Sequence, residues 1–259
     1  MIQPYYEDAA VTLYHGDCLD ILPQLEPVDH VITDPPYEVE AHTNARRLNA
    51  QHDIRDYVIE FSAITEEVRE RFTAECGRLS RGWVLVFCQS EAIGSWRRAL
   101  ETGGCAWKRA QAWVKPDSAP QFTGDRPAVG FECIATAWAG SGKSKWNGGG
   151  KRGVYEHCVN NFGRLTAGRP HPTMKPLPLM TELVTLFTDQ GETILDPFAG
   201  SGTTGVAAKL NGRKAILIER EGKYCEIAAK RLRETEPGRL FDKAPRAKPR
   251  RLLDVSAEI

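Results

Sequence analysis

Short apolar runs alternate with longer stretches of helical character along most of this chain, and this alternation constrains the fold more than any other feature. Several runs lack the apolar–polar alternation of a half-exposed strand, which favours a sheet that is buried on both faces. The expected strands are residues 11–14, 28–33, 83–88, 111–114, 133–138, 193–195 and 215–218. The expected helices are residues 57–79, 91–102, 177–189, 203–211 and 223–234. Strands separated by helices predict an α/β domain with a mostly parallel sheet and helices on both faces.

Length, charge and cysteine content narrow the class of protein. A length of 259 residues suits one large α/β domain with insertions. Lys+Arg and Asp+Glu both number 34, so the overall charge neither indicates nor excludes a nucleic-acid partner. Seven cysteines without a C-x-x-C pair argue against a disulfide scaffold or a zinc site. We therefore expect a cytoplasmic protein without metal, membrane helix or signal peptide.

The tetrapeptide Asp34-Pro35-Pro36-Tyr37 directly follows an expected strand. Open parallel sheets bind ligands at the carboxyl ends of their strands, so this corner is placed for a site. The prolines fix the backbone and remove two N–H donors, which leaves the Asp34 carboxylate and the Pro35 carbonyl as acceptors. Two acceptors can hold the exocyclic amine of a nucleobase, and Tyr37 offers a face for the base to stack on. An ordinary Asp-Pro turn with an incidental aromatic is the structural alternative.

A second loop, residues 196–204, follows the expected strand 193–195 and opens a helix. It reads Asp196-Pro197-Phe198-Ala199-Gly200-Ser201-Gly202-Thr203-Thr204. Its glycines allow a tight turn against a ligand, and a helix N-terminus favours a negative group such as a carboxylate. The next strand leads to Glu219, where an acidic side chain can accept hydrogen bonds from ribose hydroxyls. The loop therefore predicts a nucleotide-like cofactor.

The glycines at 200, 202 and 205 also match the G-x-G-x-x-G pattern of dinucleotide-binding enzymes. A nicotinamide enzyme would need several more strands after residue 219. Only about 40 residues follow, and they are expected to form one helix and a tail. Half of the nucleotide fold must then lie N-terminal to the loop, in a permuted order, and this disfavours a dehydrogenase.

These motifs resemble those of the amino-methyltransferases that modify DNA. Residues 34–37 match the catalytic motif of that family, and residues 196–202 match its S-adenosylmethionine loop. The order, with the catalytic motif first, an insertion next and the cofactor loop last, is similar to the β class. Gly16-Asp17-Cys18 resembles the segment that contacts the cofactor's adenine, and residues 171–176 resemble the motif at its methionine end. The resemblance covers roughly residues 11–235.

The resemblance implies a Rossmann-like S-adenosylmethionine-dependent methyltransferase fold, with a seven-stranded, mostly parallel sheet that includes one antiparallel strand. Residues 1–138 would form the catalytic half, 139–170 an inserted target-recognition region, 171–235 the cofactor-binding half and 236–259 a basic tail. It also implies that the base is flipped out of duplex DNA into the pocket. The methyl group would pass directly to the amine, without a covalent enzyme intermediate and without a metal.

Cofactor contacts are expected in both halves of the domain. The candidate residues are Asp17, Cys18, Thr173, Lys175, Asp196, Pro197, Phe198, Gly200, Ser201, Gly202, Thr203 and Glu219. In the family's pattern Thr173 and Lys175 would contact the cofactor carboxylate. Asp17 has the alternative of capping a helix, and Lys175 that of a solvated charge. Glu132 lies where the family often has an acidic residue, so it is a further candidate for the site.

DNA contacts are expected in two segments. Residues 139–170 carry eight glycines and six Lys or Arg residues against one Glu, and residues 38–56 resemble the family's mobile loop after the catalytic motif. Lys and Arg would neutralise phosphates, while Asn, Arg and aromatic side chains could read base edges. The candidates are Asn44, Arg46, Arg47, Lys143, Lys145, Lys151, Arg152, Arg164 and Arg169. A basic loop without DNA contacts is the alternative.

The favoured activity is methylation of adenine at N6 in duplex DNA. Methylation of cytosine at N4 is the near alternative, because the D-P-P-Y motif serves both, but a serine in place of Asp34 would have favoured cytosine. Protein glutamine methyltransferases typically carry Asn at this position and have the cofactor loop first. A DNA-binding protein without catalysis would not need both Asp34 and Gly200. One subunit offers little surface for a duplex and many β-class enzymes form dimers, so we expect a homodimer.

Overall fold

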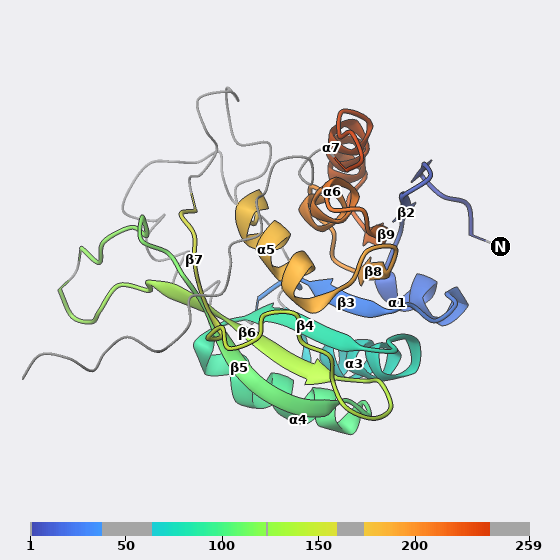
Figure 1. The fold of residues 1–259 in the computed structure, drawn as a ribbon. Helices are drawn as coiled ribbons and strands as arrows, with labels where there is room; N and C mark the ends of the chain where they lie inside the picture. Colours follow the sequence, from blue (N-terminus) through green and yellow to red (C-terminus); the bar gives the residue numbers. More distant parts are fainter. Residues whose placement is uncertain (1, 38–63, 123, 160–173, 239–259) are drawn as a thin grey trace, which may run out of the picture.

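A nine-stranded sheet runs through the part of the chain that the computed structural model describes, residues 2–37, 64–122, 124–159 and 174–238 (Figure 1). The strands are β1 (Tyr6–Glu7), β2 (Val11–His15), β3 (His30–Thr33), β4 (Trp83–Cys88), β5 (Ala106–Val114), β6 (Phe131–Trp138), β7 (Val154–Glu156), β8 (Thr193–Asp196) and β9 (Lys214–Glu219). Their spatial order is β1-β2-β9-β8-β3-β4-β6-β5-β7. The permuted order is visible here, because β8 and β9 lie between β2 and β3.

The directions of the strands confirm the expected sheet and add to it. Strands β2, β9, β8, β3 and β4 are parallel to one another, and β6 is antiparallel to both β4 and β5. These seven strands are the predicted set, with β6 as the reversed one. Two short edge strands were not predicted: β1 pairs antiparallel with β2, and β7 pairs parallel with β5.

Helices cover both faces of the sheet (Figure 1). They are α1 (Cys18–Ile21), α3 (Glu66–Leu79), α4 (Ile93–Thr102), α5 (Leu177–Phe187), α6 (Thr203–Leu210) and α7 (Gly222–Arg233). The apolar side chains of α1, α3 and α4 form one core with the sheet, and those of α5, α6 and α7 form a second core on the opposite face. Every residue of β3 and β4 is buried, as the uninterrupted apolar sequence of β4 predicts. Strand β3 also buries His30 and Thr33, whose side chains are hydrogen-bonded.

Several element boundaries differ from those expected. Strand β5 begins at Ala106 rather than at 111, because the exposed and partly charged residues 106–110 are held by pairing with β6. The described part of the first long helix begins at Glu66, where the Thr65 hydroxyl accepts a hydrogen bond from the Val68 N–H at 3.2 Å. Residues 57–63 lie outside the described part. None of the described helices has the length and apolarity needed to cross a membrane.

The topology brings the carboxyl ends of β2, β9, β8, β3 and β5 to one edge of the sheet. The reversed strand β6 begins at that same edge and ends at the opposite one, beside the start of β4. Ligands of open α/β sheets bind at the carboxyl edge, where strand order changes. This edge is therefore where a ligand site is expected.

Candidate active site

The two motifs found in the sequence lie side by side, because β3 and β8 are adjacent parallel strands. A hydrogen bond joins them: the Thr33 hydroxyl donates to Asp196 Oδ1 at 2.7 Å. Asp196 also accepts from the Thr204 hydroxyl at 2.5 Å and from the Phe198 N–H at 3.2 Å. Burial raises the pKa of Asp196 to about 6, although these donors act to lower it. Asp196 thus fastens the cofactor loop to the catalytic strand.

Both motifs open into one cavity of about 570 Å³, a volume typical of small-molecule sites. Residues from five strand ends line it, together with the segment that precedes α5. Of the predicted residues, those that line it are Asp17, Cys18, Asp34, Pro35, Pro36, Tyr37, Lys175, Asp196, Pro197, Phe198, Gly200, Ser201, Thr203 and Glu219. Glu132 and Lys115 line it as well. The catalytic and cofactor motifs are therefore close enough to serve one reaction.

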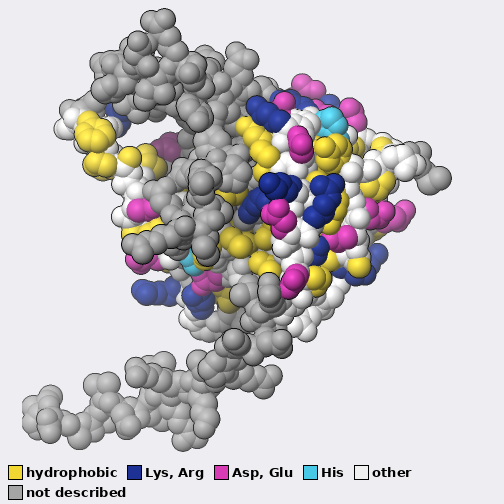
Figure 2. All heavy atoms as spheres, turned by 90° about the horizontal axis from the view of Figure 1, so that it is seen from above, with side chains coloured by type: hydrophobic (Ala, Val, Ile, Leu, Met, Phe, Trp, Pro, Cys, Tyr) yellow, Lys and Arg dark blue, Asp and Glu magenta, His cyan; other side chains and the backbone are white. Residues whose placement is uncertain are grey.

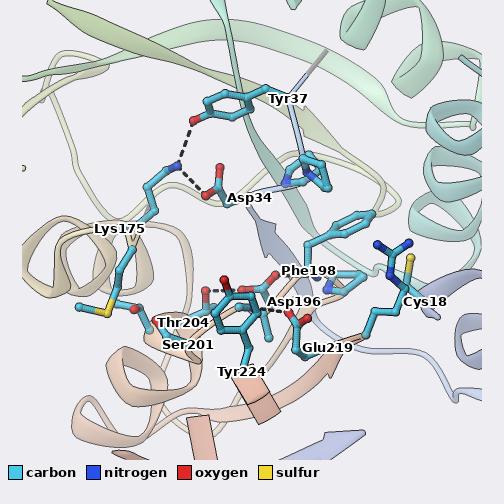
Figure 3. A pocket seen from close by; sticks show the side chains of 18 of the residues that line it. Cys18, Asp34, Tyr37, Lys175, Asp196, Phe198, Ser201, Thr204, Glu219 and Tyr224 are labelled. Carbon is cyan, nitrogen blue, oxygen red and sulfur yellow. Dashed lines mark hydrogen bonds and ion pairs between the residues drawn. The ribbon is translucent and has the colours of Figure 1, made fainter. Parts of the chain in front are cut away.

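Asp34 uses one carboxylate oxygen and leaves the other unpaired. Its Oδ2 accepts a hydrogen bond from Lys175 Nζ at 2.5 Å, whereas its Oδ1 is buried with no hydrogen-bond partner among the described residues (Figure 3). A buried acceptor without a donor costs about 1–3 kcal/mol, so such an atom calls for a ligand group. Burial raises the pKa of Asp34, while the nearby Lys175 acts to lower it.

Lys175 is paired with the Asp34 carboxylate rather than lying in open solvent. Its Nζ donates to Asp34, to the Tyr37 hydroxyl at 3.0 Å and to Glu132 Oε2 at 3.2 Å. An ammonium group has three N–H donors, so the three partners use all of them. The structure thereby excludes the reading of Lys175 as a solvated charge. Its expected contact with a cofactor carboxylate remains a prediction, and it would require the loss of one of these partners.

Glu132 anchors this cluster, a role the sequence only suggested. Its Oε2 accepts a hydrogen bond from the Tyr37 hydroxyl at 2.5 Å, and its Oε1 pairs with the ammonium group of Lys115. Burial would raise the pKa of Glu132, but Lys175 and Lys115 hold it at about 2. Burial and the two carboxylates raise the pKa of Tyr37, so its hydroxyl keeps its proton. Lys115 carried no motif signal, and only the pairing of β5 with β6 reveals it.

The two glycines of the loop 196–204, Gly200 and Gly202, have different surroundings. Both have backbone conformations in the left-handed region, with φ +51° at Gly200 and φ +76° at Gly202. A Cβ at Gly200 would meet no atom within 4 Å, and its N–H donates to Glu219 Oε2 at 2.8 Å. A Cβ at Gly202 would lie 2.9 Å from the Cβ of Ala228 in α7. Gly202 therefore permits close packing of the loop on α7, and its expected cofactor contact remains a prediction.

Arg231 of α7 holds the same loop, and sequence reasoning missed it. Its guanidinium donates to the Ser201 carbonyl at 2.5 Å, to the Ser201 hydroxyl at 3.0 Å and to the Thr203 hydroxyl at 3.0 Å. Burial lowers the pKa of Arg231 to about 10. The structure shows Ser201 and Thr203 bound to the protein's own arginine, and their expected cofactor contacts remain predictions.

The remaining predicted cofactor residues have local roles that the structure does show. Asp17 caps α1 by accepting the Leu19 N–H at 2.8 Å. Phe198 packs edge-to-face on Phe72 of α3, with ring centroids 5.3 Å apart. Burial raises the pKa of the Cys18 thiol to about 12, so it stays protonated. Each of these residues also lines the cavity, which is compatible with the expected cofactor contacts. The contacts themselves remain predictions. Thr173 lies outside the described residues.

The predicted DNA-binding residues are only partly described: Asn44, Arg46, Arg47, Arg164 and Arg169 lie outside the described residues. Lys143 and Lys145 follow β6, at the edge of the sheet opposite the cavity, and Lys145 pairs with Asp189. Lys151 pairs with Glu182 of α5 at 2.8 Å. Figure 2 shows Lys and Arg mixed with Asp and Glu over the described part of one face, not a continuous basic surface. Lys143 and Lys145 thus lie at a different edge of the sheet from the cavity, and the expected DNA contacts of the described cations remain predictions.

Comparison with known proteins agrees with the fold and the cavity. The model of the N6/N4 DNA methylase family matches residues 28–230, so the chain belongs to that family. It is 30% identical to the type II methyltransferase M2.LlaDCHI of Lactococcus lactis subsp. cremoris and 29% identical to M2.DpnII of Streptococcus pneumoniae. Both alignments cover 90% of this chain and 93% of the relative.

Solved structures of DNA methyltransferases have the same fold as this chain. The complex of M1.HpyAVI with S-adenosylmethionine superposes with a TM-score of 0.65 at 28% identity, over 86% of this chain and 98% of that one. The PvuII cytosine-N4-specific DNA methyltransferase superposes with a TM-score of 0.69 over 89% of each chain, but at 16% identity. The protein is an S-adenosylmethionine-dependent DNA methyltransferase.

The residues present in the cavity fit this cofactor. Glu219 stands at the end of β9 with both carboxylate oxygens bound to backbone N–H groups, which leaves further lone pairs for hydroxyl donors. The turn at Gly200 leaves open space on the cavity side, and the N-terminus of α6 favours a carboxylate. S-adenosylmethionine supplies a methyl group on a positively charged sulfur when it is bound.

Proposed function

We propose that this enzyme methylates the N6 amine of adenine in duplex DNA. The observation that carries the proposal is the buried Oδ1 of Asp34, which has no hydrogen-bond partner among the described residues. Asp34 and Tyr37 both line the shared cavity. An exocyclic amine is the donor that this acceptor lacks. Aspartate at position 34, where serine would favour cytosine, supports adenine over cytosine.

The geometry supports a direct transfer in which the protein positions the amine. Asp34 Oδ1 and the Pro35 carbonyl would accept the two N–H groups of the amine, which turns the nitrogen lone pair out of the ring's π-system. Tyr37 would stack on the base, a contact worth roughly 1–3 kcal/mol. Most of the rate enhancement would come from orientation and from fixed charges rather than from a covalent intermediate.

Replacement of Asp34 by Ala tests this assignment. We expect methyl transfer to fall by about a hundredfold or more, because the amine loses its acceptor. The affinity for S-adenosylmethionine, measured by calorimetry, should stay within about threefold, since Asp34 is needed for the base and not for the cofactor. Glu101→Ala removes an exposed carboxylate at the far end of α4 and is the control. Retained activity in Asp34→Ala would show that the catalytic acceptor lies elsewhere.

The methylated base itself separates the two candidate activities. DNA from methylation-deficient cells that express the protein, digested to nucleosides and analysed by mass spectrometry, should contain N6-methyladenine. N4-methylcytosine in its place would establish the alternative. Single-molecule sequencing of the same DNA would then report the recognition site.

DNA binding by the segment before β7 is a further part of the proposal. Replacing Lys151 and Arg152 by Ala should weaken DNA binding and reduce the slope of log K against log salt by up to about 2, because two phosphate contacts are lost. The matched control is Lys108→Ala with Arg109→Ala, two exposed cations near the start of β5 at the opposite edge of the sheet, which should leave the slope unchanged. The reverse result would place DNA on that opposite edge.

We also propose that the enzyme is a homodimer, on the grounds of its resemblance to the β class and of the small surface that one subunit offers to a duplex. Sedimentation equilibrium at micromolar concentration should give about twice the 28.8 kDa chain mass. A monomer that methylates DNA at full rate would contradict this.

A further inference from the structure

We propose that Lys175 is a positioning residue of the methyl transfer: its ammonium group holds Asp34 and Tyr37 where the base is received, and Glu132 holds Lys175. This inference rests on the proposed role of Asp34. It assigns to Lys175 a task other than the binding of the cofactor's carboxylate, which the family pattern had suggested.

The first support is the complete use of the donors of Lys175. It donates to the Asp34 carboxylate, the Tyr37 hydroxyl and Glu132, at 2.5, 3.0 and 3.2 Å respectively. The first two contacts are drawn in Figure 3, where the Lys175 side chain reaches across the cavity from the segment before α5. Because these partners use all three N–H groups, Lys175 serves the protein's own residues.

The second support is the enclosure of the ammonium group. Its Nζ lies 5.0 Å from the ring centroid of Phe87, 5.3 Å from that of Tyr37 and 5.8 Å from that of Trp113. Only 9% of the Lys175 side chain is exposed. Aromatic faces attract a cation and exclude water, so the charge is fixed in place and weakly screened.

The third support is the anchoring of Glu132. Lys115 pairs with one of its oxygens, while Tyr37 and Lys175 bind the other. With Asp34, the cluster holds two carboxylates and two ammonium groups, so its charges balance within the cavity wall. Glu132 therefore holds both Lys175 and the Tyr37 hydroxyl in place.

The contact with Lys175 determines which oxygen of Asp34 remains available as an acceptor. With Oδ2 taken by Lys175, Asp34 presents Oδ1 alone to a ligand. Without Lys175, the carboxylate can rotate about its side chain. It would also face the negative charges of Glu132 and Asp196 inside a buried site, and Lys115 would be the cation left to oppose them among the described residues that act on Asp34. A protonated Asp34 is itself a donor at one oxygen, and it cannot hold the amine in the same way.

The test compares Lys175→Met, Lys175→Arg and Glu132→Gln with Lys108→Met, an exposed lysine at the start of β5, far from the cavity. In Lys175→Met we expect kcat to fall about a hundredfold, while the Kd for S-adenosylmethionine and the KM for DNA stay within about threefold. Lys175→Arg should recover part of the rate, because it restores the charge. Lys108→Met should match the wild type.

The pH dependence distinguishes positioning from simple packing. Loss of Lys175 removes a charge that lowers the pKa of Asp34, so the acid limb of the kcat profile should move to higher pH. Loss of the Glu132 charge removes one that raises it, so Glu132→Gln should move that limb to lower pH. A residue that only fills space would lower the rate in both variants without opposite shifts.

A readout without catalysis separates this inference from the proposed function. The Asp34 carboxyl carbon can be titrated by 13C NMR in the cofactor-free protein, where the same two opposite shifts are expected. Unmoved midpoints would overturn the inference even if the enzyme methylates adenine. A Kd for S-adenosylmethionine that rises more than tenfold in Lys175→Met, with kcat kept at saturation, would overturn it as well, because Lys175 would then hold the cofactor. If both shifts are observed but Asp34→Ala retains activity, the proposed catalytic role fails and the positioning of Asp34 stands.

Discussion

Two aspartates, 34 and 196, follow adjacent strands and carry out different tasks because their partners differ. Asp196 has both oxygens bound to hydroxyl and amide donors of the protein, so it is a structural fastener. Asp34 has one oxygen bound to a lysine and the other free of partners among the described residues. The sequence places both at strand ends, but only their hydrogen bonds show which one can act on a substrate.

The two loop glycines allow a test at the same scale. Gly202→Ala should lower the free energy of unfolding by about 2–4 kcal/mol, because a left-handed alanine is strained and its Cβ meets Ala228. In Gly200→Ala the left-handed backbone is strained, but the added Cβ meets no atom within 4 Å. The free energy of unfolding should therefore fall by only about 1–2 kcal/mol. Urea denaturation measures both.

Cofactor titrations of the same variants provide the complementary measurement. Gly200→Ala should weaken binding of S-adenosylmethionine more than Gly202→Ala does, since only Gly200 lies on the cavity wall. A stable Gly202→Ala protein that fails to bind the cofactor would show that Gly202, too, faces the ligand.

Short elements at the edges of the sheet are held by side chains from distant parts of the chain. The β1–β2 turn is fixed by Asp8, which accepts the Ala10 and Val11 N–H groups at 2.8 Å and pairs with Lys209 of α6. At the other edge, the hydroxyl of buried Tyr155 in β7 donates to Gln111 of β5 at 2.5 Å. These contacts explain why strands of two and three residues form where local sequence does not predict them.

The Asp8 contacts predict a pH dependence of stability. Burial would raise the pKa of Asp8, but Lys209, Tyr6 and the turn amides hold it at about 2, below its ordinary value of 3.8. A lowered carboxyl pKa stabilises the fold above about pH 4, and that contribution is lost as the pH falls through about 2. Asp8→Asn should therefore be less stable than the wild type at pH 7, and the difference should shrink between pH 4 and pH 2.

Urea denaturation across this pH range measures the effect, with Glu26→Gln as the control for loss of an exposed carboxylate. A constant difference between Asp8→Asn and the wild type over the whole range would show that the Asp8 charge does not stabilise the turn.

On the scale of the whole molecule, the cavity lies at one edge of the sheet, where segments from both halves of the chain meet. Asp34-Pro35-Pro36-Tyr37 follows β3, and the glycine loop 196–204 is at the end of β8, which is more than 150 residues later in the sequence. A ligand in this cavity contacts both halves, so its binding energy adds to the stability of the whole domain.

Thermal unfolding should report this coupling. At a concentration of S-adenosylmethionine one hundred times its Kd, the free energy of unfolding should rise by about 2.7 kcal/mol. The melting temperature should then rise by roughly 5 to 11 °C for a domain of this size. Asp34→Ala should show the same increase, because its carboxylate serves the base. Loss of the increase in that variant would place the cofactor against Asp34.

The sequence by itself determined the class of fold, the seven main strands and the two motifs that line the cavity. Buried strands need apolar runs, and tight ligand-binding turns need proline and glycine at fixed positions. These features can therefore be predicted from short stretches of sequence. Parts of the site could be predicted in the same way, since Asp34 and Gly200 belong to short motifs whose proline and glycine residues specify a turn.

Only the tertiary structure decided which side chains meet across the sheet. Lys175, Glu132 and Lys115 come from separate elements, and their ion pairs depend on the reversed strand β6 lying between β4 and β5. The same topology places Lys143 and Lys145 at the edge of the sheet opposite the cavity. It also packs Gly202 against α7. Charge and composition cannot show this, because the direction and order of strands fix the partners of residues that lie far apart in the chain.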